Sequence, residues 1–225
     1  MMIVICNSKG GVGKSTLAAH LVLWAHSLRI KTALIDTDKQ RSSSQWIAEA
    51  EPTIVVRVAT TPEECLKEAT ELRKSHDIVV GDGPAGLDDI SRTLLILADL
   101  AILPLTPSIL DLRSVQQATD VLKFAQGING GRPEGRIVLN KMKTRDSISK
   151  ELSLAAQKLG VQVAKSVIRD LQAYRDAAGQ ATSVSFLGKK AQSAADDIDA
   201  LFRELLDDKV DELVSMTLKK EVANG

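Results

Sequence analysis

Residues 8–16 read Ser8-Lys9-Gly10-Gly11-Val12-Gly13-Lys14-Ser15-Thr16, between an apolar run at 2–6 and a helical pattern that begins at residue 17. Glycines let successive backbone N–H groups turn inward around phosphate oxygens. The lysine at position 14 can then reach the β- and γ-phosphates, and the hydroxyl of Ser15 can ligate Mg²⁺. The stretch therefore predicts a strand, a phosphate-binding loop and a helix that together hold a nucleoside triphosphate.

Two residues at the entrance of this loop depart from the usual phosphate-loop pattern. Ser8 stands where that pattern has glycine, and Lys9 adds a second lysine. Lys9 comes too early in the loop to reach easily the phosphates of a nucleotide bound by its own subunit. We therefore expect its ammonium group to point outward, toward a nucleotide held by a second subunit.

The sequence KGGVGKST at 9–16 resembles the deviant Walker A box of the ParA/MinD family of dimerising ATPases. In that family the first lysine crosses to the nucleotide of the partner subunit. The resemblance implies that ATP is the ligand and Mg²⁺ the cofactor. The ATP-binding residues that it implies in the loop are Lys9, Gly10, Gly11, Val12, Gly13, Lys14, Ser15 and Thr16.

Length and composition favour one compact domain over residues 1–225, because 44% of the chain is hydrophobic. The formal net charge is zero, so a polyanionic partner would have to meet a local patch. Cys6 and Cys65 form neither a spaced pair nor a metal-binding set, which indicates reduced, structural thiols. The sequence has no leader peptide and no membrane-spanning apolar run, so we expect a cytoplasmic protein.

Short apolar runs alternate with helical segments along most of the chain. The runs, rich in Val, Ile and Leu, are 2–7, 31–36, 53–58, 77–81, 99–105, 135–140 and 161–164. This alternation predicts an α/β fold, a doubly wound and mostly parallel sheet of about seven strands with helices on both faces. In such sheets, ligands bind beyond the carboxyl ends of the strands.

Carboxylates follow two of these predicted strands. Asp82 ends the fourth and is placed to hold a water molecule on Mg²⁺. Asp36 and Asp38 end the second, two residues apart, and we expect them to have different roles. In the family that LIDTDKQ at 34–40 resembles, the acid at Asp38 orients the attacking water and the acid at Asp36 lies near the waters of Mg²⁺. The implied metal-site residues are Ser15, Asp36 and Asp82, and the implied catalytic residues are Lys9, Lys14 and Asp38.

Three further positions bear on this resemblance. Lys39 stands where the family commonly has proline, which implies a less rigid loop after Asp38. The segment 103–111, which includes Pro107, looks like the proline-rich segment of short ParA-type partition proteins, where it lies by the nucleotide and the dimer interface. Asn140 matches the position that contacts the base. Composition alone fits an ordinary turn before a helix at Pro107 equally well.

The C-terminal third divides into a basic and an acidic block. Residues 141–190 hold ten Lys/Arg and four Asp/Glu, whereas 191–225 hold four and nine. The resemblance implies a basic face that binds DNA without sequence preference. The alternative is that each charged block is an ordinary solvent-exposed face. The candidate DNA-contacting residues are Arg169, Arg175, Lys189 and Lys190.

A long amphipathic helix is predicted at about 189–220. Its polar face is strongly acidic and would be repelled by anionic lipid, so we expect it to pack against the sheet or a partner subunit and not to bind a membrane.

The resemblance implies a partition or positioning ATPase. Its ATP-sandwich homodimer would bind nucleoid DNA and be released by an adaptor, ParB-like or McdB-like, that stimulates hydrolysis. The cargo would be a plasmid, a chromosome or a protein body such as a carboxysome, as in the McdA branch. A MinD-like membrane-cycling ATPase and a small-molecule P-loop ligase remain alternatives.

Overall fold

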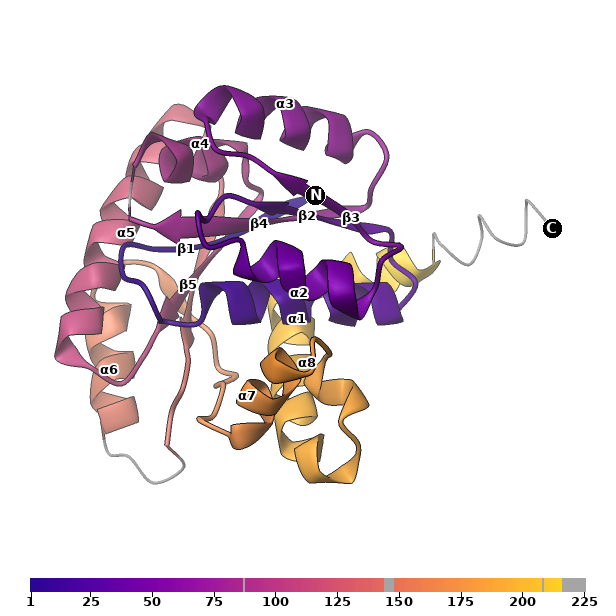
Figure 1. Cartoon of the computed structure of the whole chain (residues 1–225). Helices are drawn as coiled ribbons and strands as arrows, with labels where there is room; N and C mark the ends of the chain where they lie inside the picture. The colour runs from indigo at the N-terminus through magenta and orange to yellow at the C-terminus, as the bar shows by residue number, and fades with distance from the viewer. Residues whose placement is uncertain (87, 144–147, 208, 216–225) are drawn as a thin grey trace.

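The computed structural model describes residues 1–86, 88–143, 148–207 and 209–215, in which one parallel sheet has the strand order β3-β2-β4-β1-β5-β6-β7 (Figure 1). Its strands are β1 (Met2–Asn7), β2 (Thr32–Asp36), β3 (Val55–Val58), β4 (Ile78–Ala85), β5 (Leu100–Leu105), β6 (Glu134–Leu139) and β7 (Gln162–Val163). The helices are α1 (Lys14–Ser27), α2 (Ser42–Ala50), α3 (Pro62–Arg73), α4 (Asp89–Leu97), α5 (Ile109–Ile128), α6 (Ile148–Gln157), α7 (Gln172–Gly179) and α8 (Gln192–Leu206), with 3₁₀ turns η1 (Val184–Phe186) and η2 (Lys189–Ala191). The predicted sheet is confirmed.

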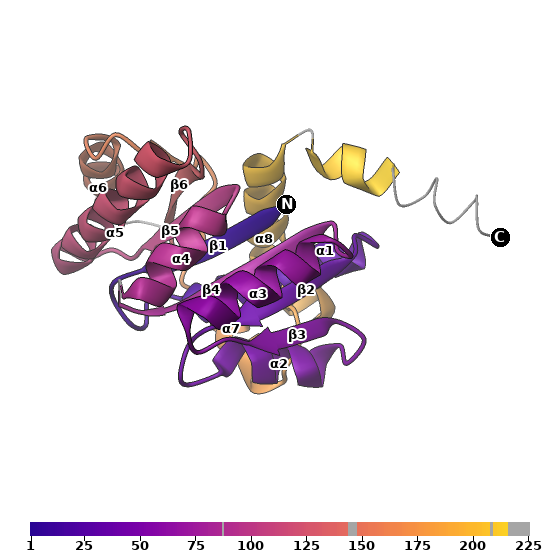
Figure 2. The same ribbon diagram turned by 90° about the horizontal axis from the view of Figure 1, so that it is seen from above.

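Helices cover both faces of this sheet, as predicted. Ile3 and Ile5 of β1 face a core built with α1, α2, α7 and α8, whereas Val4 and Cys6 face a second core built with α3, α4, α5 and α6. Figures 1 and 2 show α3 and α4 on the opposite side of the sheet from α1 and α2. Because both faces of β1 are buried, its sequence is a continuous apolar run without polar alternation.

The strand order brings the predicted functional residues to one edge. The chain runs from β1 to β2 and β3, then returns to place β4 between β2 and β1. In register, Asp36 of β2 lies beside Asp82 of β4, and Asp82 also pairs with Ile5 of β1. A Cβ on Gly83 would come within 2.9 Å of the Ile5 carbonyl oxygen, so only glycine lets the strands approach here. The carboxyl ends of β1, β2 and β4 therefore meet at the phosphate loop.

The C-terminal region differs from the single helix predicted at 189–220. The chain makes the turn η2, continues as α8, and leaves the helix at Asp207, where φ is 43° and ψ is −135°. It is helical again at 209–215, and positions 216–220 of the predicted helix lie outside the described residues. The turn returns Val210, which is 2% exposed, to the core that contains Leu206. Apolar residues continue at helical spacing across this turn, which explains the prediction of one helix.

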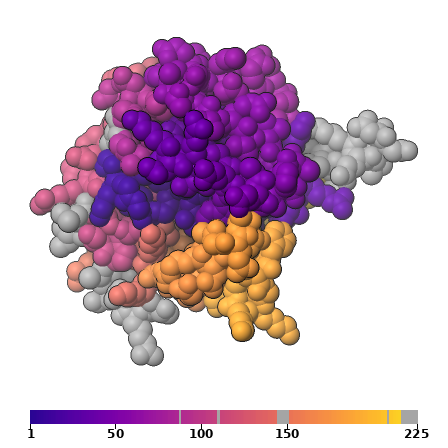
Figure 3. Space-filling view, in the orientation of Figure 1, coloured from indigo at the N-terminus to yellow at the C-terminus, as the bar shows by residue number. Residues whose placement is uncertain are grey.

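Helix α8 packs against the rest of the molecule, as expected. Leu201 and Phe202 are buried, and the indole nitrogen of Trp24 on α1 donates a hydrogen bond to Asp199 (2.9 Å). Figure 3 shows the C-terminal segment as a prominence below the N-terminal half of the chain. In the described part of the chain, no helix has the length and apolar character needed to cross a membrane.

Candidate nucleotide-binding site

The phosphate loop joins the end of β1 to the first turn of α1. Gly11 (φ 76°) and Gly13 (φ 94°) take left-handed backbone conformations, which glycine adopts at little cost. Gly13 is the N-cap residue of α1, and no side chain in the described residues caps that helix. The free N–H groups and the positive end of the helix dipole make this loop an anion-binding site.

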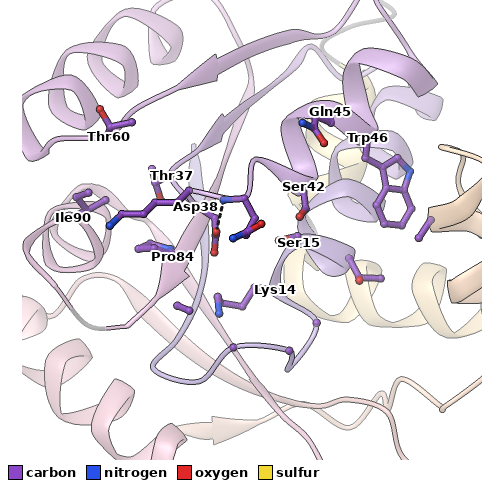
Figure 4. Close-up of a pocket in the computed structure, with 18 of the residues that line it drawn as sticks. Lys14, Ser15, Thr37, Asp38, Ser42, Gln45, Trp46, Thr60, Pro84 and Ile90 are labelled. Atoms are coloured by element: carbon purple, nitrogen blue, oxygen red, sulfur yellow. Dashed lines mark hydrogen bonds between the residues drawn. The ribbon is translucent and has the colours of Figure 1, made fainter.

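A cavity of about 960 Å³ opens over the loop (Figure 4). Figure 4 shows Asp38 reaching toward Lys14 from the loop that follows β2, with Trp46 of α2 at the far side. The predicted site residues that line this cavity are Gly10, Gly11, Gly13, Lys14, Ser15, Thr16 and Asp38. The structure therefore brings the phosphate loop and the predicted catalytic acid to one cavity.

Lys14 lies almost completely buried beneath this cavity. Its Nζ donates a hydrogen bond to the carbonyl oxygen of Lys9 (3.0 Å), and its side chain is flanked by carboxylates. Burial lowers the pKa of Lys14, whereas Asp82 and Asp38 act in the opposite direction. An ammonium group in this position can exchange its bond to the backbone for bonds to phosphate oxygens.

Asp82 presents unsatisfied oxygens at the same place. It is fully buried, and neither carboxylate oxygen has a hydrogen-bond partner among the described residues. Burial raises the pKa of Asp82 to about 7, while the nearby hydroxyls of Ser15 and Ser43 act to lower it. A buried carboxylate beside the hydroxyls of Ser15 and Ser43, next to a phosphate loop, suits a hydrated Mg²⁺ ion.

Asp36 and Asp38 have different surroundings, because the chain turns directly after β2 ends at Asp36. Asp36 is fully buried, and its two oxygens accept hydrogen bonds from the backbone N–H groups of Asp38 (3.0 Å) and Ser44 (2.8 Å). It thus fixes both the turn after β2 and the start of α2. Asp38 lines the cavity, with one oxygen bonded to the N–H group of Gln40 (2.9 Å). The role of Asp36 near the waters of Mg²⁺ stays a prediction.

The entrance of the loop is docked onto α5. The Lys9 ammonium pairs with Asp111, and the Ser8 hydroxyl lies 3.2 Å from the carbonyl oxygen of Ser114 and 3.1 Å from Gln117 Oε1. The departure from glycine at position 8 therefore has a structural reason in this chain. In this single subunit Lys9 is held by its own chain, and its reach to a partner subunit stays a prediction.

Asn140 braces the phosphate loop from the end of β6. Its side-chain amide donates a hydrogen bond to the carbonyl oxygen of Val12 (2.7 Å), and its oxygen accepts one from the N–H group of Lys141 (3.0 Å). Contact between Asn140 and the base stays a prediction, as does a nucleotide contact at Pro107, which is outside the set of described residues that line the cavity.

Several lining residues were not expected from the sequence. Lys141 bonds the carbonyl oxygen of Gly11 through Nζ (2.7 Å), and Thr37 bonds the carbonyl oxygen of Asp82 through its hydroxyl (2.7 Å). Others come from the segments after β2 and β3: Lys39, Gln40, Ser42, Gln45, Trp46, Glu49 and Thr60. Thr37, Lys39, Gln40, Thr60 and Lys141 follow closely after strand ends, which was the signal available in the sequence, whereas Ser42, Gln45, Trp46 and Glu49 lie in α2 and carried no such signal.

The four candidate DNA-contacting residues differ in availability. Arg169 forms a two-pronged ion pair with Asp197, with nitrogen–oxygen distances of 2.9 and 2.7 Å, and Arg175 pairs with Asp170 at 3.0 Å. Lys189 and Lys190 are exposed side by side in η2, just before α8. These lysines are therefore the better placed of the four to meet a polyanion.

Comparisons with known proteins agree with this geometry. The model of the CobQ/CobB/MinD/ParA nucleotide-binding domain matches residues 3–184. The maintenance of carboxysome distribution protein A of Halothiobacillus neapolitanus is 30% identical over 211 residues, which cover 91% of this chain and 95% of that protein. Among solved structures, apo McdA of Cyanothece superposes with a TM-score of 0.74 at 17% identity, over 91% of this chain and 98% of that one. An ATP complex of a Cyanothece McdA variant gives a TM-score of 0.72 at 16% identity, over 95% and 96%.

Proposed function

Because the chain belongs to the family of CobQ/CobB/MinD/ParA nucleotide-binding domains and is a P-loop ATPase, we propose that it is an ATP-dependent positioning ATPase. Its ATP-bound form is a homodimer that sandwiches two nucleotides and binds nucleoid DNA without sequence preference. Hydrolysis, stimulated by an adaptor protein, ends the DNA-bound state. The observation that carries this proposal is the cavity shared by Lys14 and Asp38, with Lys9 beside it at the loop entrance.

The chain's own residues divide the work of hydrolysis. The loop N–H groups and Lys14 bind the triphosphate, and Asp82 and Ser15 hold a hydrated Mg²⁺ ion. When bound, that ion neutralises charge on the phosphate oxygens. Asp38 orients a water molecule whose oxygen forms a bond to the γ-phosphorus as the bond from that phosphorus to the β,γ-bridging oxygen breaks. The products are ADP and phosphate, and the water's proton is released to solvent. Phosphoryl transfer of this kind needs positioning and charge stabilisation more than covalent catalysis, and the cavity offers both.

Lys9 makes the complete site depend on two subunits. Its ammonium group, from the partner, adds positive charge to the phosphates of the facing nucleotide. Hydrolysis is thereby coupled to dimerisation, and the protein acts as a timed switch.

The cargo is proposed from the similarity to a carboxysome distribution protein along almost the whole of both chains. We propose a protein body of the carboxysome type, with an McdB-like adaptor, in preference to a plasmid or a chromosome with a ParB-like adaptor. The expected location is the nucleoid in the cytoplasm.

The membrane-cycling alternative is disfavoured by burial. The apolar residues of α8, including Leu201 and Phe202, belong to the core, and its exposed face carries acids. A helix with that distribution has no apolar face left for a bilayer and would be repelled by anionic lipid. A small-molecule P-loop ligase would need no ATP-dependent dimer and no DNA.

The experiment is retention of DNA fragments with ATP, with ADP and without nucleotide, over a range of salt concentrations. We expect binding with ATP alone, insensitive to DNA sequence, with a log–log salt slope of roughly −0.9 for each phosphate contact. The double variant Lys189→Ala/Lys190→Ala should weaken binding and flatten the slope, with ATP affinity unchanged. The matched control is Lys31→Ala/Lys67→Ala, which removes the same charge from exposed positions elsewhere in the chain. Binding that ignores nucleotide, or binding to anionic vesicles in place of DNA, would refute the proposal.

A further inference from the structure

Asp111 is a buried carboxylate beside the nucleotide site, and it has no role in the proposed mechanism. It lies in the first turn of α5 and is only 3% exposed. The Lys9 ammonium bonds one of its oxygens, and the hydroxyl of Thr106, just after β5, bonds the other. Both oxygens are therefore satisfied, one of them by the lysine on which the dimer depends.

The two partners of this ion pair differ in freedom. The side chain of Lys9 is 43% exposed, whereas that of Asp111 is 4% exposed. A lysine on a flexible four-carbon stem can leave such a contact, but the carboxylate cannot follow it. Departure of Lys9 leaves a buried negative charge supported by Thr106 and the start of α5, which is a less stable arrangement than the intact pair.

The surrounding contacts hold the loop entrance in the geometry that forms this pair. The N–H group of Lys9 donates to Asn7 Oδ1 (3.0 Å), and the side-chain amide of Asn7 donates to the carbonyl oxygen of Pro104 (2.7 Å). One helical turn beyond Asp111, α5 also receives the hydroxyl of Ser8. The two residues that depart from the usual loop pattern, Ser8 and Lys9, thus both dock onto α5.

We propose that Asp111 is the positioning residue for Lys9, and that it stores the lysine on its own subunit until the partner's triphosphate competes for it. A triphosphate carries more negative charge than one carboxylate, so a facing nucleotide can draw Lys9 away from Asp111. ADP, which lacks the γ-phosphate, competes less well. Asp111 thereby sets a threshold for dimerisation and favours return to the single subunit after hydrolysis. The inference rests on the proposed function, since it assigns how the lysine of that same site is held in reserve.

The first test measures Lys9 in the single subunit, without nucleotide. An amine-reactive acetylating reagent is applied for short times at fixed pH, and mass spectrometry follows the peptide that contains Lys9, with exposed Lys67 as the internal reference. Asp111→Asn should speed Lys9 labelling several-fold, because a lysine released from a buried carboxylate is more available to the reagent. Thr106→Val should give a smaller increase. The matched control, Asp120→Asn, removes an exposed carboxylate from the same helix and should change nothing. Equal labelling of Lys9 in Asp111→Asn and the wild type would overturn the storage role.

The second test measures the ATP-dependent dimer by light scattering over a range of protein concentrations. In the wild type, only subunits whose Lys9 has left Asp111 can form the dimer, which weakens dimerisation. The Asp111→Asn variant keeps Lys9 free, so its dimer should have a dissociation constant lower on the order of tenfold. Weaker dimerisation would overturn the proposal and make Asp111 a support of the dimer instead. Absence of an ATP-dependent dimer in both proteins would refute the proposed function together with the competition, while the labelling would still report whether Asp111 holds Lys9.

Discussion

The phosphate loop and the C-terminal segment at 165–206 hold their functional groups in different ways. In the loop, the backbone conformation of Gly11 and Gly13 and the start of α1 point N–H groups at one place, whatever the distant side chains do. In the C-terminal segment, the availability of each cation depends on its acidic neighbours, as the pairing of Arg169 with Asp197 shows. A site built from main chain is fixed locally, whereas a charged surface is fixed only when the whole fold is known.

His20 joins these two regions. Its Nδ1 lies 2.8 Å from the carbonyl oxygen of Thr16, one turn earlier in α1, and its Nε2 accepts a hydrogen bond from the N–H group of Val184 (3.3 Å) in η1. Its ring also meets Trp46 of α2 and Tyr174 of α7 edge-on. Substitutions in the phosphate loop, in the C-terminal segment or at His20 therefore test how far the two regions are independent.

The largest effect is expected at the phosphate loop. Lys14→Ala removes the ammonium group that serves the triphosphate, so ATP affinity should fall on the order of 100- to 1,000-fold, and ATP-dependent DNA binding with it. Isothermal titration calorimetry checks the affinity, and circular dichroism checks that the fold is kept. The control is Lys67→Ala, which removes an exposed lysine of α3. An affinity equal to that of the wild type would show that this cavity is not the ATP site.

The next effect separates binding from hydrolysis within the loop region. Asp38→Ala should slow single-turnover ATP hydrolysis on the order of 100-fold, because the water is no longer oriented, while ATP and Mg²⁺ still bind. The ATP dimer should become long-lived. Asp38→Asn keeps an acceptor for the N–H group of Gln40 and should still lose more than about tenfold, since the negative charge is gone. Normal turnover in the alanine variant would remove Asp38 from the mechanism.

The smallest effect concerns the junction at His20. Burial lowers the pKa of His20 from its ordinary value near 6.5 to about 4, and the contact of Nδ1 with the carbonyl oxygen of Thr16 acts in the opposite direction. As pH falls through 6.5 the unfolded chain binds a proton that the folded chain refuses, so stability falls until about pH 4. This group should lower the free energy of unfolding by about 2 kcal/mol between pH 8 and pH 5.

Urea unfolding at several pH values measures this dependence. His20→Gln should lose that component of the pH dependence, and His26→Gln, at a partly exposed position, should keep it. An identical pH profile in His20→Gln and the wild type would mean that His20 is not the buried neutral group described here.

The sequence predicted the main-chain features well because they depend on local patterns. The seven apolar runs became strands, and the carboxyl ends of β1, β2 and β4 carry the loop, Asp38 and Asp82 as expected. Side-chain partners were not predictable. The ion pair of Lys9 with Asp111 joins positions 102 residues apart, and the bond of Asn140 to Val12 joins positions 128 apart. The turn at Asp207 was also missed, since no glycine or proline marks it and the apolar spacing continues through it.

The central claim is that two subunits complete one site through Lys9. If Lys9 meets phosphate oxygens across a dehydrated interface, its removal should cost the dimer on the order of 2–5 kcal/mol. The most direct measurement is molar mass by light scattering with ATP, in an Asp38→Ala background that keeps the nucleotide intact, for chains with Lys9 and with Lys9→Ala. We expect twice 24.2 kDa with Lys9 and 24.2 kDa without it, at similar ATP affinity. An intact ATP-dependent dimer of the Lys9→Ala chain would contradict the claim and leave Lys9 as a lysine that serves only its own subunit.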